Sequence, residues 1–387
     1  MNIKMIKIWS IFALSLTICL VSVFILPGCS TSQQPVQEET PVQEEEAEEE
    51  TQETAEEQGE AVEVEEAEEE AGGSIADLEI KGNINILNGF ELSDTVSDDR
   101  PVAVMVENSP PARPQSGLIN ADIVFEVVDE YNITRYIAVF SSKEADIIGA
   151  VRSARIYYAE IARSLDPIYV FWGTYDDAYP VLKKMDMDVL DANSDVHFPY
   201  TNAGWRDYSR SDISWSTAFI NTQGIKEDAI ESGYSLEGGQ SPMRFKIDAV
   251  ESERGSITDI NINISIAEYI IDFKYNKDKN NYSKFTAGTP HIDFDSGEQI
   301  NVNNIIVLVT NIDGPIDQYG HMVVRTIGTH EIGEAYYFLD GNVIEGTWGR
   351  SSIFDPFEFR DLDGNPVLFN RGSTWVCMIP DSTRLSY

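Results

Sequence analysis

The sequence predicts an α+β fold, in which an N-terminal mixed α/β domain precedes a mostly antiparallel β C-terminal domain. In the first part, short apolar runs rich in β-branched residues alternate with a segment of helical spacing. In the second part, apolar runs are separated by Asp-Gly pairs, which favour hairpins. The chain beyond residue 73 exceeds what one hydrophobic core usually supports, so we expect two domains, at 98–240 and 256–387.

The first residues have the pattern of a bacterial lipoprotein signal peptide at 1–28. Lys4 and Lys7 precede an uncharged apolar run, and Cys29 follows that run closely as the expected lipidated residue. The alternative is an uncleaved membrane helix, because the run is nearly long enough to cross a bilayer. A doubly acylated Cys29 would anchor the chain stably. We therefore expect a lipid-anchored protein on the outer face of the bacterial cytoplasmic membrane.

The segment 29–73 is predicted to be a disordered, Glu-rich tether. It contains 18 glutamates and no lysine, arginine or aromatic residue. Such a composition cannot bury enough apolar surface to fold, and its charges repel one another. The whole chain carries a formal charge of −39, and it stays acidic without the tether. This field disfavours nucleic acid as a partner.

The N-terminal domain is predicted from four apolar runs and three helical segments. The runs at 102–106, 123–128, 136–140 and 168–172 have the composition of buried strands. The segment 154–165 has helical spacing and is ended by Asp166-Pro167, and shorter helices are expected at 178–185 and 224–232. The intervening stretch 191–222 is polar and aromatic. It reads as a long loop over the core. The aromatic stretch from Trp172 to Phe219, which overlaps this loop, either fills the core or contacts a sugar or peptide.

The C-terminal domain is predicted to consist of strands. We expect them at 257–266, 269–275, 305–310, 322–326, 334–339, 343–348 and 374–379. The boundary between the two domains is expected at 238–255.

The loops between the N-terminal strands carry the candidate ligand-binding residues, which are Arg113, Gln115, Glu126, Arg135, Arg152, Ser153 and Arg155. Arg152 and Arg155 flank the start of a predicted helix, and Ser153 could cap it. Guanidinium groups beside free backbone N–H groups suit a carboxylate or phosphate. The alternative is a structural network in which the arginines pair with acidic neighbours such as Glu130.

Two functions follow from these residues. The first is a binding or scaffold protein of the cell envelope, whose arginine-lined pocket takes an anionic group of a wall fragment, a peptide or an envelope protein. The second is a hydrolase-like enzyme that uses Glu126 or Glu130 beside Arg152. We favour binding over catalysis.

No metal or other cofactor is expected. His330 and Glu331 resemble half of a zinc-protease helix, but the second histidine is missing. The acidic turns at 293–295 and 361–365 lack the full set of calcium ligands. Cys377 lies in an apolar run and is predicted to be a buried thiol rather than a nucleophile.

Several motifs resemble the YerB-like family of bacterial lipoproteins, which contains the N- and C-terminal domains of unknown function 3048. The motifs are RPVAVMVEN (100–108), ARPQSGL (112–118), ADIVFE (121–126), ITR (133–135), VRSAR (151–155), YYFLDGNVIEGTW (336–348) and NRGSTWV (370–376). The resemblance implies a lipid-anchored extracytoplasmic protein of two domains, and it implies no activity. The Pro-His-Asn run that relatives carry after an Arg-Asp pair is absent here, which weakens the case for a histidine base.

Overall fold

A computed structural model describes residues 78–328 and 333–387. These residues belong to one compact unit, 69–387. Within the described ranges, no helix is both long and apolar enough to cross a membrane. Some of the predicted features lie outside the described residues, namely the signal peptide at 1–28, the lipidation site Cys29, the tether at 29–73, His330 and Glu331.

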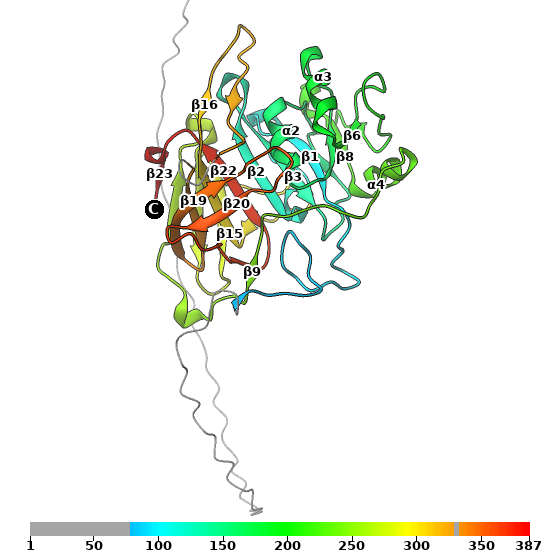
Figure 1. Cartoon of the computed structure of the whole chain (residues 1–387). Coiled ribbons are helices and arrows are strands. Elements are labelled where there is room, and N and C mark those ends of the chain that lie inside the picture. Colours follow the sequence, from blue (N-terminus) through cyan, green and yellow to red (C-terminus); the bar gives the residue numbers. More distant parts are fainter. Residues whose placement is uncertain (1–77, 329–332) are drawn as a thin grey trace, which may run out of the picture. The chain divides into compact units, whose positions relative to one another are not determined.

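A ten-stranded mixed sheet forms the centre of the compact unit (Figure 1). Its strands, from one edge to the other, are β20 (Glu358–Asp361), β19 (Asn342–Gly349), β18 (Glu334–Leu339), β15 (Asn304–Val309), β22 (Thr374–Ile379), β2 (Ile123–Val128), β3 (Thr134–Phe140), β1 (Val102–Glu107), β5 (Ile168–Phe171) and β6 (Asp188–Asp191). The central strands are buried on both faces, which explains their unbroken apolar runs.

The two expected domains, 98–240 and 256–387, share this sheet. They meet where β22 pairs in parallel with β2, with Thr374 opposite Ile123. The N-terminal part combines parallel and antiparallel strands with helices, and most strand pairs of the C-terminal part are antiparallel. The predicted α+β fold class is therefore confirmed.

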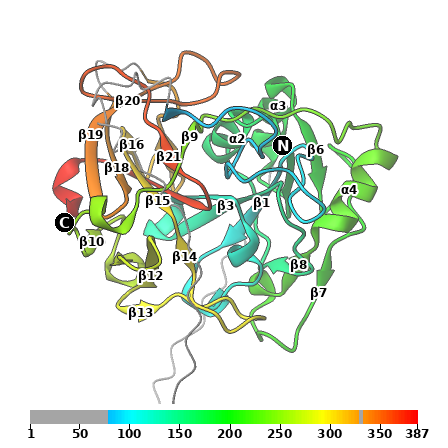
Figure 2. The same ribbon diagram turned by 90° about the horizontal axis from the view of Figure 1, so that it is seen from below.

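A six-stranded sheet covers one face of the central sheet. Its strands are β13 (Thr289–Pro290), β12 (Asn281–Thr286), β11 (Ile271–Asn276), β10 (Asp259–Ile262) and β23 (Leu385–Ser386), with β14 (Asn301–Val302) paired to β12. Figure 2 shows β10, β12 and β13 gathered on one side of the unit. The contact between the two sheets is a hydrophobic core to which Tyr136 and Trp375 contribute from the larger sheet and Ile271 and Phe273 from the smaller.

Helices cover the opposite face of the central sheet. Helix α2 (Ile156–Arg163) and the single turn α3 (Tyr179–Leu182) contribute to a second core with the odd-numbered residues of β2 and β3. A third helix, α4 (Thr222–Glu231), instead contributes Ile225 and Ala229 to the core on the side of the six-stranded sheet. Its N-cap residue is Asn221, whose side chain accepts a hydrogen bond from the Gly224 N–H. Successive side chains of a strand point to opposite faces of the sheet, so odd- and even-numbered residues of β2 and β3 lie in different surroundings.

Three small sheets complete the unit. They pair β4 (Ile148–Gly149) and β7 (Trp205–Arg206) with β8 (Ala218–Ile220), β16 (Ile312–Asp313) with β17 (Val323–Val324), and β9 (Phe245–Lys246) with β21 (Phe369–Asn370). Two sequence predictions need correction. The stretch 191–222 contains β7 and β8 rather than only loop, and the expected strand at 322–326 is reduced to the two residues of β17.

Candidate functional site

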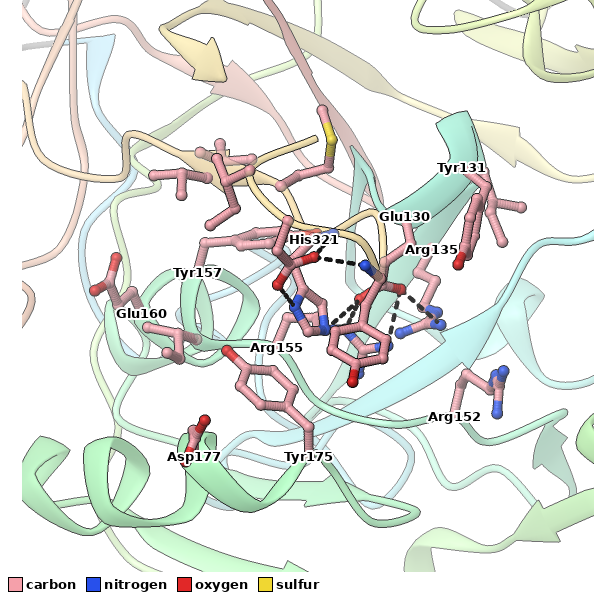
Figure 3. A pocket seen from close by; sticks show the side chains of 18 of the residues that line it. Glu130, Tyr131, Arg135, Arg152, Arg155, Tyr157, Glu160, Tyr175, Asp177 and His321 are labelled. Carbon is pink, nitrogen blue, oxygen red and sulfur yellow. Dashed lines mark hydrogen bonds and ion pairs between the residues drawn. The ribbon is translucent and has the colours of Figure 1, made fainter. Parts of the chain in front are cut away.

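A cavity of about 780 Å³ opens where β2 turns into β3 and where α2 begins (Figure 3). We call it the Arg152 cavity. Its charged and aromatic lining residues are Arg135, Arg152, Arg155, Glu130, Glu160, Asp176, Asp177, Asp317, His321, Tyr131, Tyr157, Tyr175 and Tyr319. The volume is within the range of small-molecule sites, about 300–1,000 Å³.

The tight connection between β2 and β3 places the acidic and basic groups together. The turn runs through Asp129 and the 3-10 segment η3 (Glu130–Asn132), where Tyr131 and Asn132 have left-handed backbones with φ of 57° and 62°. This reversal allows Glu130 and Arg135, five residues apart in the sequence, to form an ion pair with 3.4 Å between Arg135 Nη2 and Glu130 Oε2.

Arg135 is the buried centre of the charged network. It is 1% exposed, and its Nη1 lies 2.7 Å from Asp129 Oδ2 and its Nη2 3.4 Å from Glu130 Oε2. Burial opposes the charged guanidinium, but Asp129 and Glu107 raise the pKa of Arg135 above its ordinary value. Arg135 is therefore a permanently charged cation that is ion-paired with Asp129 and Glu130, while its Nε makes no hydrogen bond to a described residue.

Arg155 binds Glu130 in a two-pronged ion pair. Its Nε and its Nη2 both donate to the Glu130 carboxylate, the second at 2.8 Å. Burial raises the pKa of Glu130; Arg155 opposes this shift, whereas Asp129 adds to it. For Asp129, burial alone would raise the pKa, but Arg135 and Arg155 hold it below its ordinary value. The two neighbouring carboxyls thus differ in acidity because the arginines favour Asp129.

Arg152 differs from the other two arginines. Its Nε donates to Glu107 Oε2 at 2.7 Å, and its side chain is 30% exposed. Within 78–328 and 333–387, neither terminal nitrogen of Arg152 has a hydrogen-bond partner. Burial lowers the pKa of Arg152, and the nearby Arg135 lowers it further. Figure 3 shows Arg152 to one side of the paired charges, with Glu160 and Asp177 on the other side.

A hairpin from the C-terminal part forms one wall of the cavity. It joins β16 to β17 and carries His321, whose Nδ1 lies 2.6 Å from Asp317 Oδ2 and whose Nε2 lies 3.7 Å from Glu130 Oε1. The His321 ring packs against Tyr175, with ring centres 4.6 Å apart. The cavity is thus built from both halves of the chain, and Tyr175 comes from the aromatic stretch that the sequence singled out.

The structure divides the predicted ligand-binding residues between the two faces of the central sheet. Arg135, Arg152 and Arg155 line the Arg152 cavity. Arg113 and Gln115 do not; they line a separate cavity beside β12 and β13. The expectation that all four arginines meet in one pocket is therefore wrong, because the chain crosses to the other face of the sheet after β1.

Glu126 is buried on that other face and lines neither cavity. Its Oε1 accepts hydrogen bonds from Asn108 and Thr134, and its Oε2 accepts one from Trp375 and lies 3.4 Å from Lys284 Nζ. Glu126 is 0% exposed, so its carboxylate has no open space beside it in which a ligand could lie. It therefore cannot act on a ligand as a general acid or base.

Ser153 does not cap α2. The N-cap residue of α2 is Arg155, which makes no capping hydrogen bond through its side chain. The Ser153 hydroxyl donates to the Trp172 carbonyl at 3.3 Å. Ser153 contributes its backbone instead, because its carbonyl accepts from Arg135 Nη1 at 3.2 Å. The capping expectation is wrong.

Glu107 and His321 are among the residues of the site that sequence reasoning missed. Glu107 ends β1 within the motif at 100–108 and holds Arg152, a role that an acidic residue closing an apolar run could have suggested. His321 reaches Glu130 from almost two hundred residues away, and no local pattern predicts that contact.

The described residues offer no protein site for a metal ion. Within 78–328 and 333–387, no three His, Cys, Asp or Glu side chains are grouped as ligands. Cys377 is buried, as predicted, and burial and Glu126 raise the pKa of its thiol well above the ordinary value.

Comparison with known proteins gives one consistent result. Two family models match, the N-terminal domain of the protein of unknown function DUF3048 at residues 87–235 and its C-terminal domain at 260–376. The chain is 30% identical over 298 residues to a Bacillus subtilis (strain 168) protein named "Putative lipoprotein YerB", covering 76% of this chain and 86% of that protein.

A solved structure supports the same relationship. The crystal structure of the YerB protein from Bacillus subtilis matches with a TM-score of 0.66 and 28% identity, over 78% of this chain and 98% of that chain. The two family models together span well over half of the sequence. This chain therefore belongs to the DUF3048 family, a family of unknown function.

Proposed function

We propose that this protein is anchored through a lipid on Cys29 to the outer face of the bacterial cytoplasmic membrane, where the Arg152 cavity binds a ligand through a single anionic group. The observation that carries the proposal is the state of Arg152. Glu107 holds its Nε, and both terminal nitrogens keep their hydrogens available at the wall of an open cavity. A guanidinium fixed in this way is pre-organised for a carboxylate.

The other two arginines support this role without sharing it. Arg135 and Arg155 are already paired with Asp129 and Glu130, so a ligand would have to break buried ion pairs to reach them. Their positive charges still face Arg152 and disfavour any further cation at that end of the cavity. Because Arg152 is the arginine of the three whose terminal nitrogens remain available, this end of the cavity can hold one anionic group.

The opposite wall restricts the ligand further. Glu160, Asp176 and Asp177 line that side, and the last two are exposed. These carboxylates would repel a polyanion such as an anionic wall polymer. The rings of Tyr175 and Tyr319 also line the cavity and offer apolar contact. A short peptide that ends in a free carboxylate, as released from the cell wall or carried by an envelope protein, fits all three conditions.

The relationship to a protein named as a lipoprotein supports the location, as does the pattern around Cys29. A charged tether at 29–73 would hold the folded unit away from the membrane surface. In this reading the protein captures or scaffolds peptide material at the envelope and needs no cofactor.

The test is peptide binding by the full-length chain. We expect an N-acetylated tripeptide with a free carboxylate to bind in calorimetry, and its C-terminal amide to bind at least tenfold more weakly. Arg152→Gln should reduce binding of the acid to the level of the amide. Arg371→Gln removes a half-exposed arginine elsewhere and should change nothing. Equal binding of acid and amide, or an Arg152→Gln variant that binds like the parent, would overturn the proposal.

One observation favours a second candidate function. Glu130 lines the same cavity with a raised pKa, mainly because it is buried, which is the state that a general acid requires. A hydrolase that used Glu130 would cleave the bound peptide. Incubation of the acid tripeptide with the protein, followed by mass spectrometry, separates the two functions: intact peptide supports binding alone, and fragments that disappear with Glu130→Gln support catalysis.

A further inference from the structure

Arg113 lies on the other face of the central sheet and has no ion pair within the described part of the chain. Its Nε donates to the Asn108 carbonyl and to Asn108 Oδ1 at 3.0 and 2.9 Å, and its Nη1 donates to the Glu268 carbonyl at 2.8 Å. The guanidinium carbon lies 4.8 Å from the centre of the Tyr269 ring. These contacts fix the guanidinium but leave its charge uncompensated, because every acceptor is neutral.

One nitrogen of this guanidinium has no partner. Arg113 Nη2 is buried and makes no hydrogen bond to any described residue. A buried donor that carries part of a positive charge is costly to leave unsatisfied, so a ligand or a water molecule should complete it.

Arg113 lines a cavity of about 330 Å³, which we call the Arg113 cavity. Pro114, Pro290 and Ile292 give it apolar walls, and Gln115 and His291 are nearly buried at its surface. The volume is at the small end of the range for ligand sites, about 300–1,000 Å³.

A buried polar network behind this cavity makes its environment cationic. Lys284 is 0% exposed, and its Nζ lies 3.4 Å from Glu126 Oε2 and 3.1 Å from His291 Nδ1. His291 Nε2 lies 2.9 Å from Gln115 Oε1. Burial, Lys284 and Arg113 together hold the pKa of His291 well below its ordinary value. His291 is therefore neutral, and Glu126 is the carboxylate that pairs with Lys284, whereas Arg113 has no carboxylate partner among the described residues.

We propose that the Arg113 cavity is a second ligand site, separate from the Arg152 cavity, and that it takes a small organic monocarboxylate. One carboxylate oxygen accepts a hydrogen bond from Arg113 Nη2, and the apolar body of the ligand lies against Pro114, Pro290 and Ile292. One uncompensated charge and apolar walls suit a singly charged ligand better than a phosphate, whose second charge would have no partner.

The experiment uses 4-fluorobenzoate and its uncharged isostere 4-fluorobenzamide as probes of the full-length chain by ¹⁹F NMR. We expect the carboxylate to bind at least tenfold more tightly than the amide. Arg113→Gln should reduce carboxylate binding to the level of the amide, and Arg371→Gln should leave it unchanged. Arg113→Lys keeps the charge and should retain part of the affinity. It is the test variant to use if Arg113→Gln does not fold.

Three results would overturn this inference. Equal binding of the two probes, or no binding at millimolar concentration, would mean that water alone completes Arg113. Carboxylate binding that persists in Arg113→Gln would place the probe elsewhere. Carboxylate binding that is lost in Arg152→Gln instead would assign the probe to the Arg152 cavity.

Discussion

Glu107 and Asn108 are consecutive residues at the end of β1, yet they hold arginines on opposite faces of the central sheet. Glu107 Oε2 accepts from Arg152 Nε at 2.7 Å, and Asn108 Oδ1 accepts from Arg113 Nε at 2.9 Å. Because strand side chains alternate, one strand end supports both cavities. The two proposed sites therefore share a common structural support while remaining chemically separate.

Asn108 should be one of the most sensitive positions of the fold. Its amide donates to Glu126 and Thr134 and accepts from Gln115 in the buried interior, and it also accepts from the half-buried Arg113. Asn108→Ala leaves several of these groups unsatisfied, and we expect a loss of about 3 kcal/mol of unfolding free energy. Urea denaturation measures this, with the exposed Asn263→Ala as control. A loss no larger than that of the control would contradict the assigned role.

Asp129 should stabilise the protein in a pH-dependent manner. Its folded pKa is lowered by Arg135 and Arg155 against the effect of burial, so its contribution is present above the unfolded pKa of about 3.9 and is lost as pH falls through the lower folded value. Asp129→Asn should cost about 3–5 kcal/mol at pH 7, because Arg135 loses a partner in the interior.

The pH series provides the check. The difference in unfolding free energy between the parent and Asp129→Asn should shrink as the pH drops below about 4. Asp363→Asn, in an exposed turn, should stay within about 0.5 kcal/mol of the parent at every pH. A constant difference across the series would show that the effect is not electrostatic.

The sequence predicted the bounds of three strands of the central sheet correctly. The expected bounds 123–128, 334–339 and 374–379 coincide with β2, β18 and β22. In β2 and β22 every residue is buried, which gives a largely apolar run in the sequence. The end of β18 is marked instead by the turn residues Asp340 and Gly341 that follow it. The strand expected at 322–326 is longer than β17, because only Val323 and Val324 find pairing partners, on the equally short β16.

For the candidate site, the sequence predicted only the contacts between residues that lie close together along the chain. Arg152 and Arg155 lie beside the start of α2, and their proximity follows from three residues of separation. The separation of Arg113 from them depends on the path of the chain after β1, and the wall carrying His321 depends on the arrangement of the C-terminal part. Neither is encoded in a pattern within a few residues.

The two family segments should depend on each other for folding. β22 of the C-terminal segment lies between β15 and β2, so a chain without it exposes the edge of β2 inside the former core. We expect residues 78–250 and 251–387, expressed separately, to lack a cooperative thermal transition and to co-purify as a folded complex when expressed together. A sharp transition for 78–250 alone would show that the N-terminal segment is an independent domain.

The membrane anchor depends on Cys29. We expect the full-length chain to incorporate labelled palmitate and to sediment with membranes in a bacterial host, because two acyl chains hold a protein stably. Cys29→Ser should lose the label and leave the membrane fraction, whereas Cys19→Ser, within the apolar run, should keep both. Retention of Cys29→Ser in the membrane would favour the uncleaved helix over the lipid anchor.

Lys284 and Glu126 should be strongly coupled. Both are 0% exposed, and burial lowers the pKa of Lys284 while Glu126 opposes that shift. Lys284→Met leaves the Glu126 carboxylate without its cation in the interior, which should cost about 3–5 kcal/mol. Glu126→Gln in the same chain removes the unpaired charge and keeps an acceptor for Trp375 Nε1, so the double variant should be more stable than Lys284→Met alone. Urea denaturation of the four proteins gives the coupling energy. Additive losses would mean that the two charges act independently, and the cationic character assigned to the Arg113 cavity would then rest on Arg113 alone.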